Sequence, residues 1–395
     1  EYRPAGRPCK RTPVYDILDA KGAQWQEVFG WERVQYFSSD SSSEMHSFRR
    51  SNAFEDVGRE CRGVRESVGI ADLTAFAKFD VTGADAEALL DRLSANKMPN
   101  KDGGTRLVHM LTDLGGIESE MTITRFGAER FYLNSAVVGE THDLDWLRQH
   151  VQPGEAVTIT DVTDDLGLLA ISGPRSRDVL AKLTDADLSN DSFRWLTAQE
   201  IVVAGVGCRA LRVSYVGELG WELHVPMEHL AELYTAIWSA GEGFGIIDYG
   251  SYAMNVMRIE KAYKAWGAEL TTEITPVEAD IGRFVDYSKD FKGKAATLER
   301  LEGDELEWIL VYAEVDATDN DCRGNEPCYD GEHLMGITTS GTWGHSVGKS
   351  LAFAYVSTSC AEPGSTFEVQ LMGERRAATV LAEPAYDPRN TRPRA

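Results

Sequence analysis

Two glutamates separated by a single residue form the first candidate site for chemistry. Glu118 and Glu120 lie in GGIESEMTI, residues 115–123, where Gly115 and Gly116 are expected to turn a hairpin. Residues at i and i+2 of a strand project from the same face, so both carboxylates are expected on one side of the sheet. Like charges on one face raise each other's pKa, and such a pair suits proton transfer. A solvated acidic strand edge that discourages edge pairing is an equally good interpretation.

A third carboxylate, Glu222, ends the segment YVGELGWE, residues 215–222. Gly217 and Gly220 permit a tight reversal between two strands. A carboxylate buried beside Trp221 would accept hydrogen bonds from an amidine-like pair of N–H donors on a ligand. Because most glutamates in proteins are solvated, an exposed strand residue is the competing interpretation.

Basic residues lie on the helix predicted to open RIEKAYKAWGAELTTEITPVEA, residues 258–279. Arg258 and Lys261 are one helical turn apart, a pattern most often typical of a salt-bridged helix face. The GPRS segment, residues 173–176, lacks the lysine of a phosphate-binding loop, and no GxGxxG follows a predicted strand. We therefore expect no flavin-binding half in this chain.

Composition excludes several classes of function. The chain has 40 Lys plus Arg against 63 Asp plus Glu, a formal net charge of −23, which opposes non-specific binding to nucleic acid or to an anionic membrane. No apolar run approaches the roughly 18 residues of a membrane-spanning helix. The six cysteines are scattered without a CxxC pair, and the eight histidines form no HExxH motif, so we expect free thiols in a reducing compartment and no metal site.

The pattern of helices and strands predicts an α+β fold. Helices are expected over residues 52–69, 84–99 (opened by Asp85) and 176–185, and hairpins of strands over residues 105–137 and 200–226. The order of elements from 70 to 150 recurs loosely from 165 to 260, which favours an internal duplication. Strand signals without helices fill the last part of the chain. We therefore expect a linker or processed end at 1–12, two α+β subdomains over 13–298, and a β-barrel domain over 308–395.

Several segments, taken together, resemble the aminomethyltransferase family, the family of the glycine-cleavage T-protein. They come in the family's order and spacing and cover the chain from about residue 12 to residue 390; they are TPVYDILDAKGAQWQEVFGWER, GGIESEMTI, YVGELGWE, RIEKAYKAWGAELTTEITPVEA, DFKGKAA and TSGTWGHSVGKSLAFAYV. The stretches FRRSNAFEDVGRECRGVRESVGI and SYVGELGWELHVP are most similar to the C-terminal folate region of dimethylglycine and sarcosine dehydrogenases.

The resemblance implies a three-domain, cloverleaf-like fold with a central channel in which tetrahydrofolate stands with its pterin buried. It implies four cofactor-binding residues, which are Glu222 on the pterin, Tyr215 in the adjoining turn, Arg258 near the folate, and Trp266. The family's GGxxDD hairpin falls on GGIESE, so Ser119 and Glu120 stand where the family has two aspartates. Glu120 is then the candidate catalytic residue that moves protons.

The function implied is capture of formaldehyde or a methylene-iminium from a methylated amine, giving 5,10-methylenetetrahydrofolate. The implied partner is an oxidative or lyase demethylase domain or subunit, such as one acting on dimethylglycine or trimethylamine N-oxide, in a bacterial cytoplasm or the mitochondrial matrix. One alternative is a self-contained methyltransferase or demethylase that moves carbon from a small methyl donor to tetrahydrofolate. Another is a binding or scaffold subunit that kept the fold without catalysis.

Overall fold

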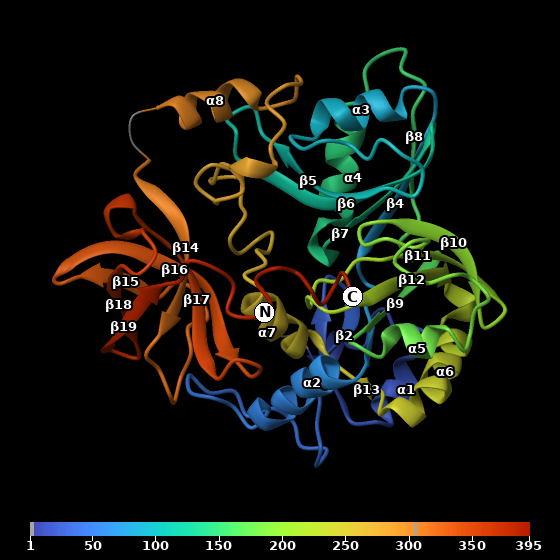
Figure 1. Ribbon diagram of the computed structural model, residues 1–395, viewed down its shortest axis with the longest axis horizontal. Coiled ribbons are helices and arrows are strands. Elements are labelled where there is room, and N and C mark those ends of the chain that lie inside the picture. The colour runs from blue at the N-terminus through green and yellow to red at the C-terminus, as the bar shows by residue number, and fades with distance from the viewer. Residues whose placement is uncertain (1–3, 304–305) are drawn as a thin grey trace.

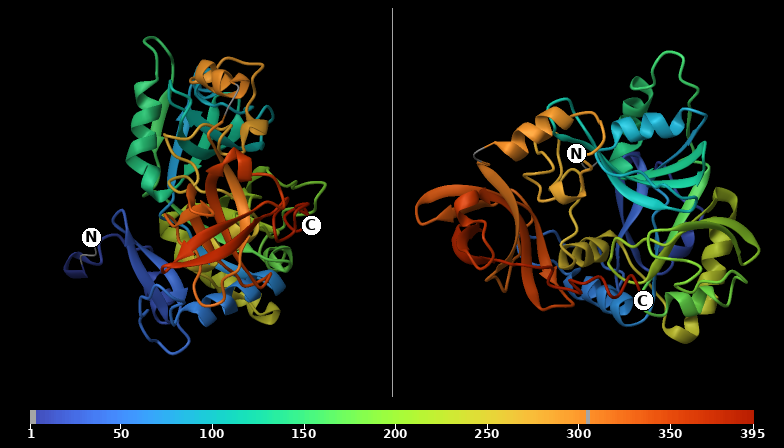
Figure 2. Two further views of the ribbon diagram at one scale, coloured as in Figure 1. Left: turned by 90° about the vertical axis from the view of Figure 1, so that its left-hand side faces the viewer. Right: turned by 45° about the horizontal axis from the view of Figure 1, so that its top comes forward.

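Three lobes surround helix α7 (Ser251–Glu260) in the computed structural model, which describes residues 4–303 and 306–395. Figure 1 shows the C-terminal barrel on one side of α7 and two α+β units on the other, and Figure 2 gives two further views. The expected three-domain α+β fold with a C-terminal barrel is confirmed.

The first α+β unit is built on a five-stranded sheet in the order β5-β6-β7-β4-β8. Alternation along its strands turns Phe79, Met121 and Leu133 toward α3 and α4, where they form one buried core with Leu89 and Leu147. The elements of this unit are β4 (Ala77–Thr82), α3 (Ala86–Leu93), β5 (Thr105–Leu111), β6 (Ile117–Gly127), β7 (Arg130–Ser135), α4 (Glu140–Gln149) and β8 (Thr158–Asp161).

The second α+β unit is built on a six-stranded sheet in the order β10-β11-β12-β9-β3-β13. Its core lies between this sheet and the helices α5 and α6, around Trp221, Leu223 and Ile237. The elements of this unit are β3 (Gly69–Asp72), β9 (Leu166–Ser172), α5 (Ser176–Leu180), β10 (Ala198–Val203), β11 (Val206–Leu211), β12 (Gly220–Pro226), α6 (Leu230–Gly241) and β13 (Ile247–Asp248).

The two units share one topology. In each, a strand and a helix are followed by three strands, a second helix and a last strand, and the three consecutive strands lie side by side in the sheet. The second sheet differs by the insertion of β3 between β9 and β13. The predicted recurrence is therefore confirmed at the level of strand order.

The N-terminal segment adds α1 (Tyr15–Asp19), the hairpin β1 (Ala23–Val28) and β2 (Trp31–Phe37), and α2 (Phe54–Glu66). Within the predicted 1–12 linker, residues 1–3 lie outside the described residues. Lys10 hydrogen-bonds through its main chain to Gly30 at 2.8 Å and to Glu32 at 2.9 Å, so this end of the segment joins the hairpin.

The third lobe is a closed barrel in the order β14-β17-β16-β15-β18-β19, which confirms the predicted barrel. Helix α8 (Lys294–Glu302) precedes it. The barrel strands are β14 (Trp308–Val315), β15 (Pro327–Asp330), β16 (His333–Gly344), β17 (Lys349–Ser357), β18 (Thr366–Leu371) and β19 (Glu374–Val380). Short 3-10 turns occur at Pro4–Gly6, Val137–Gly139, Met227–His229, Glu242–Phe244, Gly282–Phe284 and Thr358–Cys360.

Two local predictions were wrong. The helix expected over 176–185 ends at Leu180, because the N–H groups of Lys182 and Leu183 bond three residues back instead of four. The helix expected over 84–99 does begin after Asp85, its N-cap residue, but it ends at Leu93, where Ser94 takes an extended conformation.

Within residues 4–303 and 306–395, no helix is long and apolar enough to cross a membrane. The same residues contain no group of three or more His, Cys, Asp and Glu side chains arranged to hold a metal ion.

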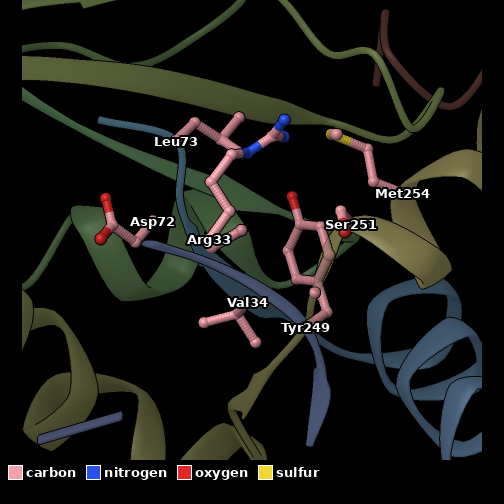
Figure 3. A pocket seen from close by; sticks show the side chains of 9 residues that line it. Arg33, Val34, Asp72, Leu73, Tyr249, Ser251 and Met254 are labelled. Atoms are coloured by element: carbon pink, nitrogen blue, oxygen red, sulfur yellow. The ribbon is translucent and has the colours of Figure 1, made fainter. Parts of the chain in front are cut away.

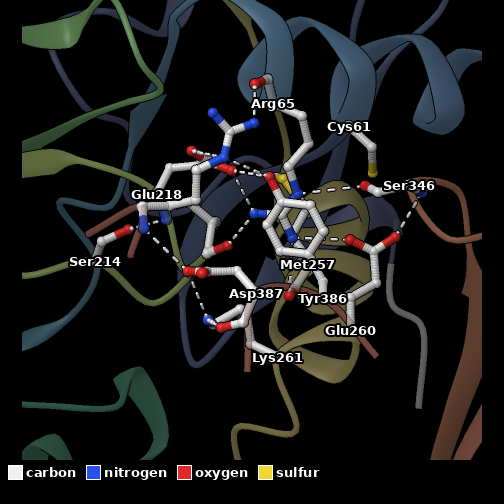
Figure 4. Close-up of polar contacts among 12 residues, drawn as sticks. Cys61, Arg65, Ser214, Glu218, Met257, Glu260, Lys261, Ser346, Tyr386 and Asp387 are labelled. Atoms are coloured by element: carbon white, nitrogen blue, oxygen red, sulfur yellow. Dashed lines mark hydrogen bonds and ion pairs between the residues drawn. The ribbon is translucent and has the colours of Figure 1, made fainter. Parts of the chain in front are cut away.

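Arg65, near the end of α2, joins the lobes through a buried cluster of charges (Figure 4). Its guanidinium donates to Glu218 of the second unit at 3.1 Å and to Glu260 of α7 at 2.8 Å. The three side chains are 5%, 1% and 0% exposed, so these charges have almost no access to solvent.

The cluster extends to the barrel and to the C-terminal tail. The Arg65 guanidinium donates to the Ser346 hydroxyl at 3.3 Å, and the Tyr386 ring centroid lies 3.8 Å from the guanidinium carbon. Tyr386 in turn donates to Glu218 at 2.6 Å. One cation on α2 therefore contacts the second unit, α7, the barrel and the C-terminal tail.

Replacing Arg65 is expected to destabilise the whole chain. Arg65→Met leaves Glu260 buried without a counter-charge and leaves Glu218 with only Arg392, at 3.6 Å, so the free energy of unfolding should fall by about 3–5 kcal/mol. Arg62→Met is a control on the same helix, since Arg62 is exposed and has no ion pair among the described residues; it should cost under about 1 kcal/mol. Urea unfolding measures both changes, and equal losses would contradict the role given to Arg65.

Candidate functional site

A row of polar contacts joins the two α+β sheets where their faces meet. Alternate residues of β7, at i, i+2 and i+4, face away from the core of the first unit, and each contacts the second sheet. The pairs are Arg130 with Glu200 at 2.7 Å, Tyr132 with His224 at 2.8 Å, and Asn134 with Glu222 at 3.4 Å. Glu222 thus ends the row, on strand β12.

The Glu222 carboxylate is largely buried and has most of its acceptor capacity unused. Its side chain is 15% exposed, and its one hydrogen bond among the described residues is the long one from Asn134. The Nε2 atom of His224 lies 3.6 Å away, beyond hydrogen-bond distance. A carboxylate offers about four lone-pair positions, so this group can still accept from a ligand.

His224 is held beside Glu222 by the phenol of Tyr132. Burial lowers the pKa of His224, so its ring is neutral near pH 7. If the Tyr132 hydroxyl donates to Nδ1, the proton of the neutral ring sits on Nε2, the atom nearer Glu222. A neutral His224 ring leaves Glu222 without a cationic ion-pair partner among the described residues.

Glu120 lies opposite His109 in the β5–β6 ladder, and its Oε2 atom is 3.0 Å from the His109 Nε2 atom. The Glu120 and His109 side chains are 15% and 5% exposed. Ser119 points to the other face of β6, where it is 1% exposed and its hydroxyl has no hydrogen-bond partner among the described residues. Of Ser119 and Glu120, the two positions that the resemblance aligns with aspartates, only Glu120 therefore lies on the face of β6 away from the core of this unit.

Glu118, on the same face as Glu120, contacts a different histidine. Its carboxylate is 2.9 Å from the Nε2 atom of His142 on α4, and the Nδ1 atom of that ring is 3.0 Å from Asp143. The Trp266 ring centroid lies 5.6 Å from that of His142, and the Trp266 indole N–H is buried with no partner among the described residues. Trp266 is thus a second group with an unused hydrogen-bonding atom.

Arg258 is placed in a buried ion pair. Its guanidinium donates to Glu269 at 2.8 Å, and the two side chains are 3% and 0% exposed. Glu269 also accepts the Ala265 N–H at 2.9 Å, so this pair fixes the loop that carries Trp266. Arg258 therefore acts on the candidate site indirectly, by holding the loop that carries Trp266.

Tyr215 lies beside the loop that carries Trp266. Its hydroxyl donates to the Lys264 carbonyl at 3.1 Å. Burial raises the pKa of Tyr215, and the charges of Arg258 and Glu120 act on it in opposite directions. The five residues selected from the sequence thus fall into two groups, with Glu222 at the sheet contact and Tyr215, Arg258, Glu120 and Trp266 around the 258–269 segment.

The residues that hold these carboxylates were not predicted from the sequence; they are Asn134, His224, His109 and His142. Alternation in ERFYLNS could have placed Tyr132 and Asn134 on one face of a strand. Their partners come from other strands and helices, and no local pattern gives that pairing.

The pKa of His142 is expected to depend mainly on Asp143. The hydrogen bond with Asp143, followed by the charges of Asp143 and Glu118, raises the His142 pKa above 6.5 against the effect of burial. Asp143→Asn should therefore lower the His142 pKa more than Glu118→Gln does, as followed by NMR titration of the ring protons. His345 is the internal control, because burial lowers its pKa to about 4 and neither variant should change that pKa. A larger decrease of the His142 pKa in Glu118→Gln than in Asp143→Asn would contradict this assignment.

Comparison with known families accounts for nearly the whole chain. Residues 14–289 match the GCVT N-terminal domain, and residues 310–387 match the glycine cleavage T-protein C-terminal barrel domain. The structure of the glycine cleavage system aminomethyltransferase T from Bartonella henselae has the same fold, with a TM-score of 0.83 at 22% identity over 96% of this chain and 99% of that one.

Two relatives are longer proteins. Mitochondrial dimethylglycine dehydrogenase of Rattus norvegicus is 40% identical over 400 residues, which cover 100% of this chain and 46% of that protein. The 4-methylaminobutanoate oxidase (formaldehyde-forming) of Paenarthrobacter nicotinovorans is 30% identical over 391 residues, which cover 98% of this chain and 47% of that protein. The chain therefore spans about half the length of these relatives. On the two domain matches, this chain belongs to the aminomethyltransferase family, that of the glycine-cleavage T-protein.

Proposed function

We propose that this chain binds tetrahydrofolate and loads it with a one-carbon unit released from a methylated amine, as formaldehyde or a methylene-iminium. The observation that carries the proposal is the Glu222 carboxylate, which is largely buried and has acceptor capacity left unused by its neighbours. A pterin presents an amidine-like pair of N–H donors, and a carboxylate can accept both at once.

Other residues fit the same ligand. The Asn134 amide oxygen and the Trp266 indole N–H are buried without partners among the described residues, so an acceptor and a donor also remain for a ligand with mixed polar edges. In this proposal Glu222 holds the pterin, Trp266 provides an aromatic surface near it, and Tyr215 and Arg258 position the loop that carries Trp266.

The chemistry divides between the cofactor and the chain. Bound tetrahydrofolate supplies the nitrogen nucleophiles that take up the carbon, so that the product is 5,10-methylenetetrahydrofolate. Glu120 takes a proton from a reacting nitrogen and returns it to the departing hydroxyl or amine, and His109 holds its carboxylate in place. Correct positioning of the reacting groups can contribute up to about 7–11 kcal/mol to lowering the barrier.

The proposal includes a partner that produces the one-carbon unit. The chain covers about half of two relatives whose names describe a dehydrogenase and a formaldehyde-forming oxidase. We propose that a demethylating domain or subunit of that kind works beside this chain. Turnover of a methyl donor by this chain alone would instead favour the self-contained methyltransferase.

Glu222→Gln is expected to weaken binding of reduced folate by about 10- to 100-fold, because hydrogen bonds to a charged acceptor contribute about 1.5–3 kcal/mol. Isothermal titration with tetrahydrofolate measures the change. Glu200→Gln is the matched control, since Glu200 belongs to the same polar row but is 53% exposed and pairs with Arg130. Unchanged affinity in Glu222→Gln would refute the pterin assignment, and no binding by the unmodified chain would favour the scaffold alternative.

Glu120→Gln is expected to leave folate affinity within about threefold and to slow carbon capture by about 10²- to 10⁴-fold, the usual range for general acid–base catalysis. The measured quantity is the rate of 5,10-methylenetetrahydrofolate formation from formaldehyde above the spontaneous reaction. Glu129→Gln, in the exposed β6–β7 turn, is the control. Equal rates in the two variants would remove Glu120 from the mechanism.

A further inference from the structure

Lys264 lies in the loop that carries Trp266, two residues before it, and its side chain has no role in the function proposed above. The Lys264 carbonyl accepts the Tyr215 hydroxyl at 3.1 Å. The charges of the Glu120 and Glu269 carboxylates act on the Lys264 ammonium, so these groups are close to it. The side chain therefore lies among the residues assigned above to the cofactor and to proton transfer.

The Lys264 ammonium is largely buried and weakly paired. Its side chain is 14% exposed, and it makes no hydrogen bond among the described residues. Its ion pair with Asp280 is long, at 3.7 Å, and the Asp280 carboxylate is 58% exposed and also lies 4.0 Å from the Arg283 guanidinium. Burial lowers the pKa of Lys264, and the nearby carboxylates only partly oppose this effect. The neutral amine is therefore favoured here more than at an exposed lysine.

Two other buried lysines have acceptors supplied by the chain. The Lys78 ammonium donates to three main-chain carbonyls, and the Lys261 ammonium donates to the carbonyl and the carboxylate of Asp387. Burial also lowers the pKa of Lys78, to about 8, but this residue has no exposed surface. Of these three lysines, only Lys264 combines burial, a lack of hydrogen-bond acceptors and contact with solvent.

Arg33 is another cation without an ion pair among the described residues, beside a pocket between β2, β3 and α7 (Figure 3). The free volume of this pocket is about 10 Å³, which holds about one water molecule. A guanidinium also keeps its proton in proteins, so it is not a nucleophile. This pocket therefore offers neither the room nor the chemistry for a reacting carbon, whereas Lys264 is a potential nucleophile that solvent reaches.

A neutral lysine amine adds to a carbonyl carbon, and desolvation is one of the ways in which proteins activate it. When the amine adds to formaldehyde, its proton passes to the carbonyl oxygen and an N-hydroxymethyl group forms. A second proton, from water, lets the hydroxyl leave as water, and a methylene-iminium remains on the lysine nitrogen. Attack by another amine on this carbon moves a proton to the lysine nitrogen, whose bond to the carbon then breaks, so the lysine is regenerated.

We propose that Lys264 holds formaldehyde as a reversible covalent adduct beside Glu120, before the carbon passes to tetrahydrofolate. This inference rests on the proposed function and adds a second reacting residue to it. The adduct keeps the carbon within the site while no cofactor is bound, when free formaldehyde would diffuse into solvent.

The first test treats the full chain, without folate, with deuterated formaldehyde and cyanoborohydride, which reduces an iminium to a stable methylamine. Peptide mass spectrometry then measures the labelling rate of each lysine. Lys264 should be labelled at least about threefold faster than the exposed Lys97 and Lys101, because each unit by which a pKa falls gives about tenfold more neutral amine. Lys78, which is buried and hydrogen-bonded, should stay unlabelled. Labelling of Lys264 no faster than that of the exposed lysines would overturn the proposal.

The second test asks whether the bound carbon can leave for the cofactor. The chain is loaded with formaldehyde, freed of excess, mixed with a folate and then reduced. Tetrahydrofolate should remove most of the label from Lys264, whereas 5-formyltetrahydrofolate, whose N5 atom is already occupied, should not. Equal labelling with the two folates would overturn the place of Lys264 in the reaction. Failure of the proposed function is a different result, in which Glu222→Gln leaves folate affinity unchanged.

Two variants separate the amine of Lys264 from its charge. Lys264→Arg keeps the positive charge and should bind tetrahydrofolate as the unmodified chain does, but it should need more formaldehyde for half-maximal product formation. Lys264→Met should behave in the same way. Weaker binding of tetrahydrofolate but not of tetrahydropteroate in Lys264→Met, with both retained in Lys264→Arg, would instead assign the ammonium to the glutamyl tail of folate and overturn the proposal.

Discussion

The arrangement of the lobes depends on one buried cation between two buried carboxylates. Burial of Arg65 depends on Glu218 and Glu260 together, and Glu260 depends on Arg65 alone for its counter-charge among the described residues, while Glu218 also has Arg392 at 3.6 Å. The three residues come from three different segments, so the charges are compensated in one relative placement of those segments. An apolar contact of the same size would tolerate sliding, whereas these hydrogen bonds do not.

This fixed placement explains how polar residues can meet between the two α+β sheets. Facing sheets usually bury apolar side chains, yet here β7 presents Tyr132 and Asn134 to His224 and Glu222. Tyr132 and His224 form a short hydrogen bond through the His224 Nδ1 atom, whereas the Nε2 atom of His224 has no hydrogen-bond partner among the described residues and the contact of Asn134 with Glu222 is long. The row is therefore complete in its middle and incomplete at Glu222, which is where a ligand can contribute the missing donors.

Patterns within single segments were predictable from the sequence, and contacts between segments were not. Strand alternation placed Glu118 and Glu120 on one face, but the expected interaction between them is replaced by contacts with His142 and His109, which depend on α4 and on the β5 register. Helical spacing suggested a surface salt bridge for Arg258, whereas its partner is Glu269, in a loop beyond the helix. Strand β15 has four residues and begins with proline, so it left no periodic signal. The family resemblance selected Glu222, although its burial follows from sheet packing that no local pattern encodes.

Comparison of the arginines shows how the chain compensates buried positive charge. Arg65 has two internal carboxylates and Arg258 has one, while Arg212 donates to main-chain carbonyls of the 193 and 395 positions. The guanidinium of each therefore donates to acceptors of the chain itself, although Arg212 has only carbonyl acceptors and its Nε atom has no hydrogen-bond partner among the described residues. Arg33 differs because its side chain is only partly buried, and its neighbouring carboxylate, Asp72, is held by Thr12 and Thr74 and makes no ion pair with it. The chain therefore buries an arginine completely only where its own carboxylates or carbonyls meet the guanidinium, and it leaves an arginine without such partners partly in contact with solvent.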